Sequence, residues 1–129
     1  MTDITLPDLE KTRSCYCLAA RKRARELTRR YEAALRPYGL KATQFSVLAA
    51  LSQTGPLPVT QLAEILGLER TTLTRVAGVM EKHGLLSISA GSKDERVRVL
   101  AVTAKGRNRL TKAIPAWKRV QDAVARELK

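Results

Sequence analysis

Residues 60–83 read TQLAEILGLERTTLTRVAGVMEKH, and this stretch decides the fold that we expect for the whole chain. It predicts two short helices joined by a tight turn, because Gly67 stands where a helix can end in the left-handed conformation that suits glycine. Thr60 is the expected N-cap of the first helix. The apolar patch of that helix consists of Leu62, Ala63, Ile65 and Leu66.

The second helix of the pair has two chemically different faces. Its apolar face, at spacing i, i+3, i+4, i+7, is Leu73, Val76, Ala77 and Met80. The opposite face, at the same spacing, is Thr71, Thr74, Arg75 and Gly78, flanked by Arg70 and Thr72. Small residues permit close approach, hydroxyls bind phosphates and Arg reads guanine edges, so this face suits a helix in a DNA major groove. An ordinary amphipathic helix hairpin is the alternative for this stretch taken alone.

Charge and length narrow the class of protein. The 129 residues suffice for one domain or one subunit of an obligate oligomer, and 24 Lys and Arg against 12 Asp and Glu give a net charge of +12. Residues 1–40 carry nine basic and five acidic side chains, residues 41–90 four and three, and residues 91–129 eleven and four. The two terminal parts of the chain are therefore basic, whereas the part that contains the expected DNA-reading helix is nearly neutral. This distribution suits a protein that binds the phosphates on either side of a groove.

Other classes of function find little support. The chain has two cysteines, Cys15 and Cys17, which do not make a disulfide framework, and we expect a cytoplasmic protein. We find no apolar run of about 18 residues that would span a bilayer, and MTDITLPDLEK does not resemble a signal peptide. With His83 as its one histidine, no Gly-rich phosphate loop and no Cys/His ligand spacing, the sequence predicts no enzyme, cofactor or metal site.

The N-terminal part is expected to form one long helix over residues 8–36, with Pro7 in its first turn and Pro37 to Gly39 ending it. Its apolar stripe is Cys17, Ala20, Ala24, Leu27, Tyr31 and Ala34. Arginines crowd the remaining faces, so a membrane surface is a possible partner, but an Ala-rich stripe partitions poorly and we expect no membrane binding. The helix is too long for a small core, which implies that another surface buries part of it.

The middle of the chain completes a winged helix. Thr43 is the expected cap of a helix over residues 44–53, whose inward residues are Phe45, Leu48, Ala49 and Leu51. Residues 55–58, GPLP, predict a loop that leads to Thr60. After the stop signal His83-Gly84, residues 86–90 alternate in polarity and residues 97–102 are β-branched and apolar, which predicts two strands around a polar turn at residues 91–96. A hairpin after a helix pair is a wing, and Lys93, Arg96 and Arg98 give it the charge for a minor groove.

The last helix is predicted to dimerise the protein. Thr103 caps it, Pro115 should bend it, and Trp117 is placed as an interface anchor. Together with Leu9 of the first helix, the expected dimer seam is Leu110, Ile114, Trp117, Val120, Val124 and Leu128. We therefore expect a mainly α fold with a small hairpin wing, in one interwoven domain: dimerisation helices at 1–36 and 104–129, and a winged helix-turn-helix lobe at 37–103.

The segment 94–106, DERVRVLAVTAKG, resembles the wing signature of the MarR family of bacterial transcription regulators, an Asp-x-Arg followed by Leu-Thr and a Gly. With the helix pair and the long flanking helices, the resemblance covers nearly the whole chain. The chain departs from the pattern at Val102, which replaces the usual Leu, at Glu69, where Asp or Ser commonly starts the recognition helix, and in its shorter C-terminal end.

The resemblance implies a homodimeric repressor whose two recognition helices enter successive major grooves of double-stranded DNA. The residues expected at the DNA are Thr60, Gln61, Arg70, Thr71, Thr72, Thr74, Arg75, Lys93, Asp94, Arg96 and Arg98. Among these, Arg96 would enter the minor groove and Asp94 would orient the wing by pairing with a nearby Arg. A winged helix that binds nucleic acid without sequence preference, or that binds another protein, is the competing function.

The resemblance also implies release of DNA by a small phenolic or anionic ligand held between the dimerisation helices and the lobe. Arg25, Tyr31, Tyr38 and Phe45 would line that pocket, and plain core packing is the alternative.

The cysteines have two interpretations. Cys17 precedes Tyr31 by fourteen residues, as in the hydroperoxide-sensing branch of the family, but Arg21 and Ala42 stand where that branch has tyrosines. Cys15 and Cys17 are either small packing residues or a redox switch. Two positions apart on a helix they would face different ways, so pairing across a dimer is easier than pairing with each other.

Overall fold

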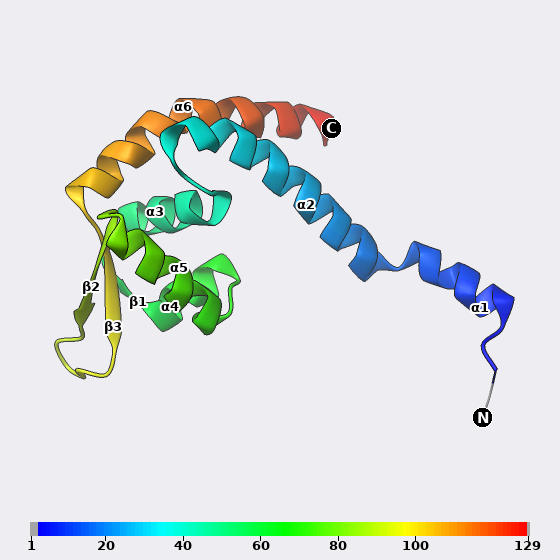
Figure 1. The fold of residues 1–129 in the computed structure, drawn as a ribbon, viewed down its shortest axis with the longest axis horizontal. Helices are drawn as coiled ribbons and strands as arrows, with labels where there is room; N and C mark the ends of the chain where they lie inside the picture. Colours follow the sequence, from blue (N-terminus) through cyan, green and yellow to red (C-terminus); the bar gives the residue numbers. More distant parts are fainter. Residues whose placement is uncertain (1–2, 129) are drawn as a thin grey trace.

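Helices make up most of the computed structural model, which describes residues 3–128; Met1, Thr2 and Lys129, at the ends of the predicted dimerisation segments, lie outside the described residues. The elements in chain order are α1 (Leu6–Lys11), the 3₁₀ turn η1 (Thr12–Ser14), α2 (Tyr16–Leu35), the 3₁₀ turn η2 (Arg36–Tyr38), α3 (Ala42–Thr54), β1 (Leu57–Pro58), α4 (Val59–Leu66), α5 (Arg70–Lys82), β2 (Leu86–Ala90), β3 (Arg98–Val102) and α6 (Ala104–Glu127). The predicted mainly helical fold with a hairpin wing is confirmed (Figure 1).

The sheet has one strand more than predicted. β2 and β3 form the expected hairpin, with Leu86 opposite Val102, and β1 adds to the other side of β3 in the order β1-β3-β2. The prediction of a plain loop at residues 55–58 is therefore wrong in part, because Leu57 pairs with Leu100. The second strand residue, Pro58, lacks an N–H, which an edge strand tolerates.

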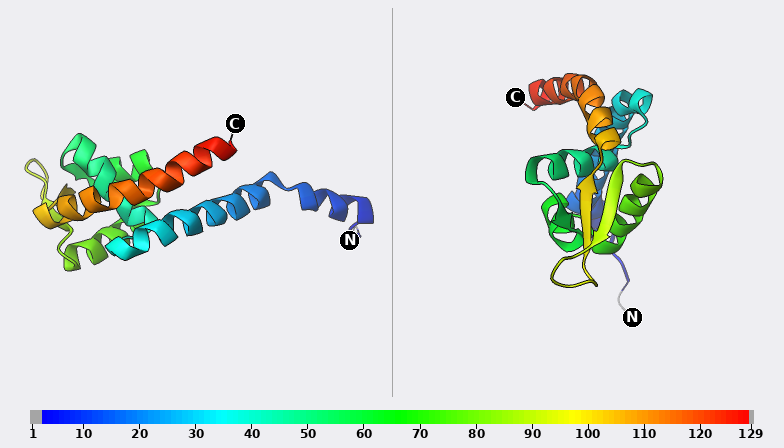
Figure 2. Two further views of the ribbon diagram at one scale, coloured as in Figure 1. Left: turned by 90° about the horizontal axis from the view of Figure 1, so that it is seen from above. Right: turned by 90° about the vertical axis from the view of Figure 1, so that its left-hand side faces the viewer.

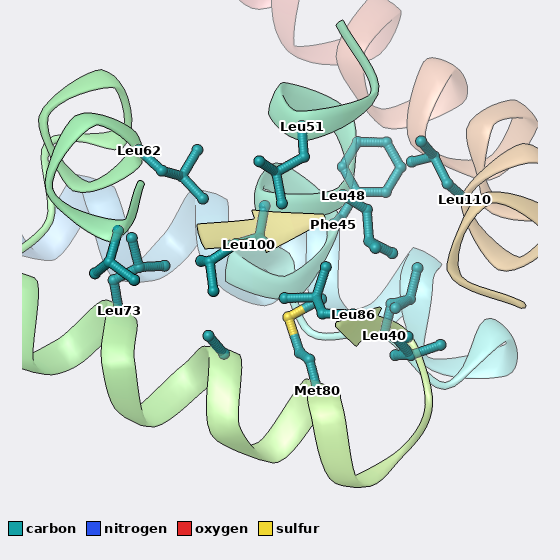
Figure 3. Packing of buried hydrophobic residues seen from close by; sticks show 14 of the residues in the cluster. Leu40, Phe45, Leu48, Leu51, Leu62, Leu73, Met80, Leu86, Leu100 and Leu110 are labelled. Atoms are coloured by element: carbon teal, nitrogen blue, oxygen red, sulfur yellow. The ribbon is translucent and has the colours of Figure 1, made fainter. Parts of the chain in front are cut away.

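The core lies between α3, α4, α5 and β3 (Figure 3). The predicted inner face of α5 is confirmed, because Leu73, Ala77 and Met80 are fully buried and Val76 is half-buried against the core. Val47 and Leu100 also lie at 0% exposure, and they join the recognition helix to α3 and the sheet. The placement of Ile65 in the apolar patch is wrong: α4 turns Leu62 inward and leaves Ile65 57% exposed.

Two predicted helix caps lie elsewhere. Thr60 was expected to cap α4, but Pro58 is the N-cap, because strand pairing keeps it extended and the helix starts directly behind it. Lys41, and not Thr43, is the N-cap of α3, and its N–H donates to the Gln44 side chain at 3.0 Å. The predicted left-handed end of α4 is confirmed, since Gly67 has φ 66°.

The expected single helix over residues 8–36 is interrupted. Cys15 has ψ 118°, which breaks the chain into α1 and α2, and the Thr12 hydroxyl donates to the Leu9 carbonyl oxygen at 2.6 Å just before the break. Such side-chain bonds compete with helix propagation where no packing opposes them. Residues 3–26 are all exposed, and α1 with the first half of α2 extends away from the lobe (Figures 1 and 2).

The C-terminal helix α6 packs on the second half of α2. Arg30 donates two hydrogen bonds to Glu127, at 3.1 and 2.7 Å, and the Tyr31 hydroxyl bonds to Gln121. α6 continues through Pro115 and arches over α3 (Figure 1). As predicted, Thr103 caps α6, since its Oγ1 accepts from the Gly106 N–H at 3.0 Å.

The predicted dimer seam divides into two parts in this chain. Leu110 is buried in the core, and Trp117 stacks on Phe45 with ring centroids 5.6 Å apart, so both are explained by packing within the chain. Val124 is also buried, at 7% exposure, and Val120 is half-buried. Leu9, Ile114 and Leu128 are exposed at 46%, 38% and 73% and remain open to a partner surface.

Candidate nucleic-acid interface

The outward face of α5 presents the residues expected to read DNA. Glu69 is the N-cap without a side-chain hydrogen bond, and Arg70 begins the helix. Thr71, Thr74 and Arg75 are exposed, whereas Thr72 is half-buried. The Thr74 hydroxyl donates to the Arg70 carbonyl oxygen at 2.8 Å, which leaves its acceptor lone pairs free. The rigid inner face holds this polar face in place, because the residues on the other side of the helix are fully buried.

The wing turn is held by a local network around Asp94. Its Oδ1 accepts from the Arg96 backbone N–H at 3.0 Å and from Nε at 3.2 Å, and its Oδ2 accepts from Nη2 at 3.2 Å. The side-chain hydrogen bonds from Arg96, and then the backbone one, lower the pKa of Asp94. The expected pairing of Asp94 with a nearby Arg is therefore confirmed. The Arg96 side chain stays 91% exposed, so it is oriented but still accessible.

A groove joins the recognition helix to the wing and brings together six of the predicted DNA-binding residues. It encloses about 520 Å³. Its lining is Val59, Thr60, Arg70, Thr74, Asp94, Arg96, Val97 and Arg98. Three guanidinium groups against one carboxylate make it electropositive. Arg98 is itself positioned, because its Nη1 donates to the Glu95 carbonyl oxygen at 3.2 Å.

The remaining predicted DNA-binding residues lie outside this groove. Thr71 and Arg75 belong to the outward face of α5, and Thr72 lies half-buried beside it. Gln61 is exposed on α4, and Lys93 is exposed in the wing turn. Val59 and Val97 also line the groove and were not predicted from the sequence. Each directly adjoins a predicted position or motif, but an isolated valine carries no pattern that would distinguish a groove wall from a core residue.

The residues proposed for a ligand pocket are only partly brought together. Tyr31 and Phe45 line a cavity of about 220 Å³ with Leu27, Thr28, Leu35, Ala42, Ser46 and Trp117. Tyr38 lines a different cavity, and Arg25 is exposed on α2. The Ala42 position, where a tyrosine was noted as missing, is part of this wall, so a small residue there leaves room in the cavity.

Both cysteines are free and exposed at the junction of η1 and α2. Cys15 is the N-cap of α2 and has an extended backbone, whereas Cys17 lies in the first turn of the helix. The expectation that both lie on one helix and face different ways is therefore wrong for Cys15. Neither thiol is covered by the other residues of the range 3–128.

Residues 3–128 contain neither a candidate metal site nor a candidate membrane-spanning helix. No three His, Cys, Asp or Glu side chains are grouped so that they would hold a metal ion. None of the helices in this range combines the length and the apolar character needed to cross a bilayer.

Comparison with known proteins places this geometry among transcription regulators. The model of the MarR family matches residues 40–97, which run from just before α3 into the wing turn. A crystal structure of the Mycobacterium tuberculosis transcriptional regulator MosR in complex with DNA is 46% identical. It superposes with a TM-score of 0.79 over 85% of this chain and 80% of that one.

Curated relatives give weaker matches. The organic hydroperoxide resistance transcriptional regulator of Bacillus subtilis (strain 168) is 30% identical over 92 residues, which are 71% of this chain and 61% of that protein. The transcriptional activatory protein BadR of Rhodopseudomonas palustris (strain ATCC BAA-98 / CGA009) is 34% identical over 73 residues, 54% of this chain and 42% of that protein. The chain spans between 42% and 61% of the length of the four curated relatives that it matches.

Proposed function

This chain belongs to the MarR family of transcription regulators, and from that premise we propose that it binds a specific double-stranded DNA sequence as a homodimer and represses transcription there. The groove between α5 and the wing is the observation that carries the proposal, because it unites Thr60, Arg70, Thr74 and Arg96 from three separate elements. In this proposal Arg75 and the threonines of α5 contact bases and phosphates in the major groove, and Arg96 enters the minor groove.

Exposed apolar side chains support a dimer made by the terminal helices. Ile4, Leu6 and Leu9 are 74%, 75% and 46% exposed, and Tyr16 and Leu18 are exposed at 90% and 42%. We assign residues 1–36 and 104–129 to dimerisation and residues 37–103 to the DNA-binding lobe. A two-fold dimer would bind two half-sites about 34 Å apart, one turn of the duplex.

The experiment compares wild-type protein with Arg75→Ala and Arg96→Ala on the promoter beside its own gene and on random DNA. Arg75→Ala should cost about 1–3 kcal/mol on the promoter and relax base preference, whereas Arg96→Ala should weaken binding to both DNAs more evenly. Arg119→Ala is the matched control, because Arg119 is exposed on α6, away from the groove. Affinity should also fall steeply with salt.

Two results would contradict the proposal. Equal affinity for promoter and random DNA at every salt concentration would favour a non-specific architectural role. A monomer at working concentrations in sedimentation analysis would remove the two-half-site geometry.

We also propose that a small ligand releases the protein from DNA. The cavity bounded by Tyr31, Phe45 and Trp117 lies between α2, α3 and α6, so a ligand there would contact both the dimerisation helices and the lobe. At about 220 Å³ it is below the usual range for drug-sized ligands and suits a single phenolic ring, because its lining supplies hydroxyl groups and no cation. Titration with phenol, with excitation where phenol does not absorb, should change Trp117 fluorescence, and an unchanged spectrum at saturating ligand would refute this assignment.

A thiol-based oxidant sensor of the same fold is the second candidate. It is favoured by the exposure of Cys15 and Cys17 and by the similarity to a hydroperoxide resistance regulator. A hydroperoxide would transfer one oxygen to the Cys17 thiolate, giving a sulfenic acid, and leave as the alcohol. Peroxide treatment followed by mass spectrometry and gel shift tests this, with Cys15→Ser and Cys17→Ser as matched variants. Unchanged DNA affinity after verified oxidation of Cys17 would remove the sensor.

A further inference from the structure

A second cavity, separate from the one bounded by Tyr31 and Phe45, opens at the N-terminal end of α6. It encloses about 630 Å³ and is lined by Pro37, Tyr38, Gly39, Ala104, Lys105, Asn108, Arg109 and Lys112. Three of these side chains are cationic, and none of the eight is acidic. Nothing in the DNA-binding proposal uses this cavity.

The three cations share one face of α6, and one of them lies in the first turn, where a helix disfavours positive charge. Lys105, Arg109 and Lys112 follow the spacing i, i+4, i+7, so they lie one above the other along the cavity wall. Like charges at this spacing repel, and Lys105 in the first turn also opposes the positive end of the helix dipole. The first turn of α6 carries no acidic residue to compensate. Within residues 3–128, no carboxylate forms an ion pair with any of the three.

Contacts hold two of these cations in place. Arg109 is half-buried and its guanidinium lies over the left-handed Gly39, where an added β-carbon would be 3.3 Å from Nη1. Lys105 Nζ donates to the His83 carbonyl oxygen at 2.8 Å. His83 is the C-cap of α5, so Lys105 connects the cavity wall to the end of the recognition helix opposite to Arg70.

The cavity is therefore remote from the surface that would meet DNA. α5 has 13 residues, which corresponds to about 20 Å between its two ends. The start of α6 also lies at the end of the hairpin opposite to the wing turn (Figure 1). A phosphate of DNA bound by the α5–wing groove is not expected to reach this site.

We propose that this cavity is a binding site for a small anion with two or more negative charges, such as a phosphorylated or polycarboxylate metabolite. Arg109 and Lys112 would bind the anion through charge-assisted hydrogen bonds. Asn108 and the Tyr38 hydroxyl supply neutral donors for the remaining oxygens. Binding would also draw Lys105 toward the anion and away from the carbonyl at the end of α5.

The test is a titration of the full-length, ¹⁵N-labelled protein with inorganic pyrophosphate, with sodium chloride adjusted to keep ionic strength constant. We expect saturable shifts of the amide signals of Gly39, Lys105 and Asn108. Arg109→Gln should weaken the apparent affinity by about tenfold or more, the equivalent of one lost charge-assisted hydrogen bond. Asn108→Asp, which is isosteric and places a carboxylate in the cavity, should do the same. Arg119→Gln removes the same charge elsewhere on α6 and should leave the affinity unchanged.

Three other outcomes would contradict the proposed anion site. Absence of shifts up to about 10 mM pyrophosphate would mean that no specific anion site exists. An equal loss in Arg119→Gln would show attraction by net charge alone. A loss of DNA affinity in both Arg109→Gln and Asn108→Asp, without pyrophosphate, would assign the cavity to a DNA phosphate. If Arg109→Gln does not fold, Asn108→Asp decides the question, and neither titration depends on the DNA-binding proposal being correct.

Discussion

Replacement of Gly106 by alanine should destabilise the protein, although glycine-to-alanine changes inside helices usually stabilise. Gly106 is buried at the start of α6, and an added β-carbon would lie 2.2 Å from the Leu85 carbonyl oxygen. Close carbon–oxygen contacts are about 3.3 Å, so α6 and the segment before β2 would have to separate by about 1 Å. The same carbonyl accepts from the Thr103 N–H at 3.2 Å, and this hydrogen bond would be lost as well.

Two opposing terms set the size of the effect. Overpacking a well-packed site costs about 1–3 kcal/mol, and the lower backbone entropy of alanine returns about 0.5–1 kcal/mol. The backbone atoms at Leu85 cannot move aside as a flexible side chain can, so we expect a net loss of about 1–2 kcal/mol. Gly78→Ala is the matched control, because nothing lies within 4 Å of its added β-carbon on α5. That variant should gain about 0.5–1 kcal/mol.

Urea unfolding followed by circular dichroism measures both variants, at several protein concentrations because assembly would add to the apparent stability. A Gly106→Ala protein as stable as wild type would refute the close contact between α6 and Leu85. It would also show that α6 can move away from the segment before β2 at a lower free-energy cost than the close packing implies.

Two further changes have expected outcomes. Trp117→Ala removes the stack on Phe45 and should lower the free energy of unfolding by about 2–4 kcal/mol. This loss is smaller than for a fully buried tryptophan because Trp117 is half-buried. A loss below about 1 kcal/mol in urea unfolding would contradict the role of Trp117 in this chain's core. Hydrogen bonds from Arg96 lower the pKa of Asp94, so the wing pairing is complete above the ordinary aspartate range and is lost only as pH falls through the lower folded-state pKa. An NMR titration of the Arg96 amide should show that step, and Asp94→Asn should abolish it.

The parts of the fold that were predictable are those that local chemistry determines. The left-handed Gly67, the buried stripe of α5 and the alternating strands of the wing each follow from the conformational or packing preference of a few neighbouring residues. Helix starts were less predictable because a distant partner decides them: Pro58 is the N-cap of α4, where pairing of β1 with β3 keeps its backbone extended. The break at Cys15 occurs where no packing within the chain holds the helix together.

In the candidate site, too, features that depend on neighbouring residues were predictable and features that depend on distant partners were not. The outward face of α5 and the Asp94–Arg96 pair could be read from spacing, since both depend on residues close in sequence. The periodicity of α6 did not reveal which positions serve the chain itself. Trp117 and Ile114 both lie at seam positions, but Trp117 meets Phe45 and Ile114 stays 38% exposed. A heptad-like pattern records that a face is apolar without stating whose surface covers it.

The Thr103 hydroxyl has a consequence for how motion would pass through the molecule. It donates to the Gly84 carbonyl oxygen at 2.6 Å, just beyond α5, while it accepts from the Gly106 N–H in the first turn of α6. The Thr103 oxygen atom therefore connects the end of α5, which would lie on the DNA, to the start of α6, which would contact the second subunit. In the proposed dimer, a change in the angle between subunits would strain these two hydrogen bonds or move α5 together with α6, and so would alter the spacing of the two recognition helices.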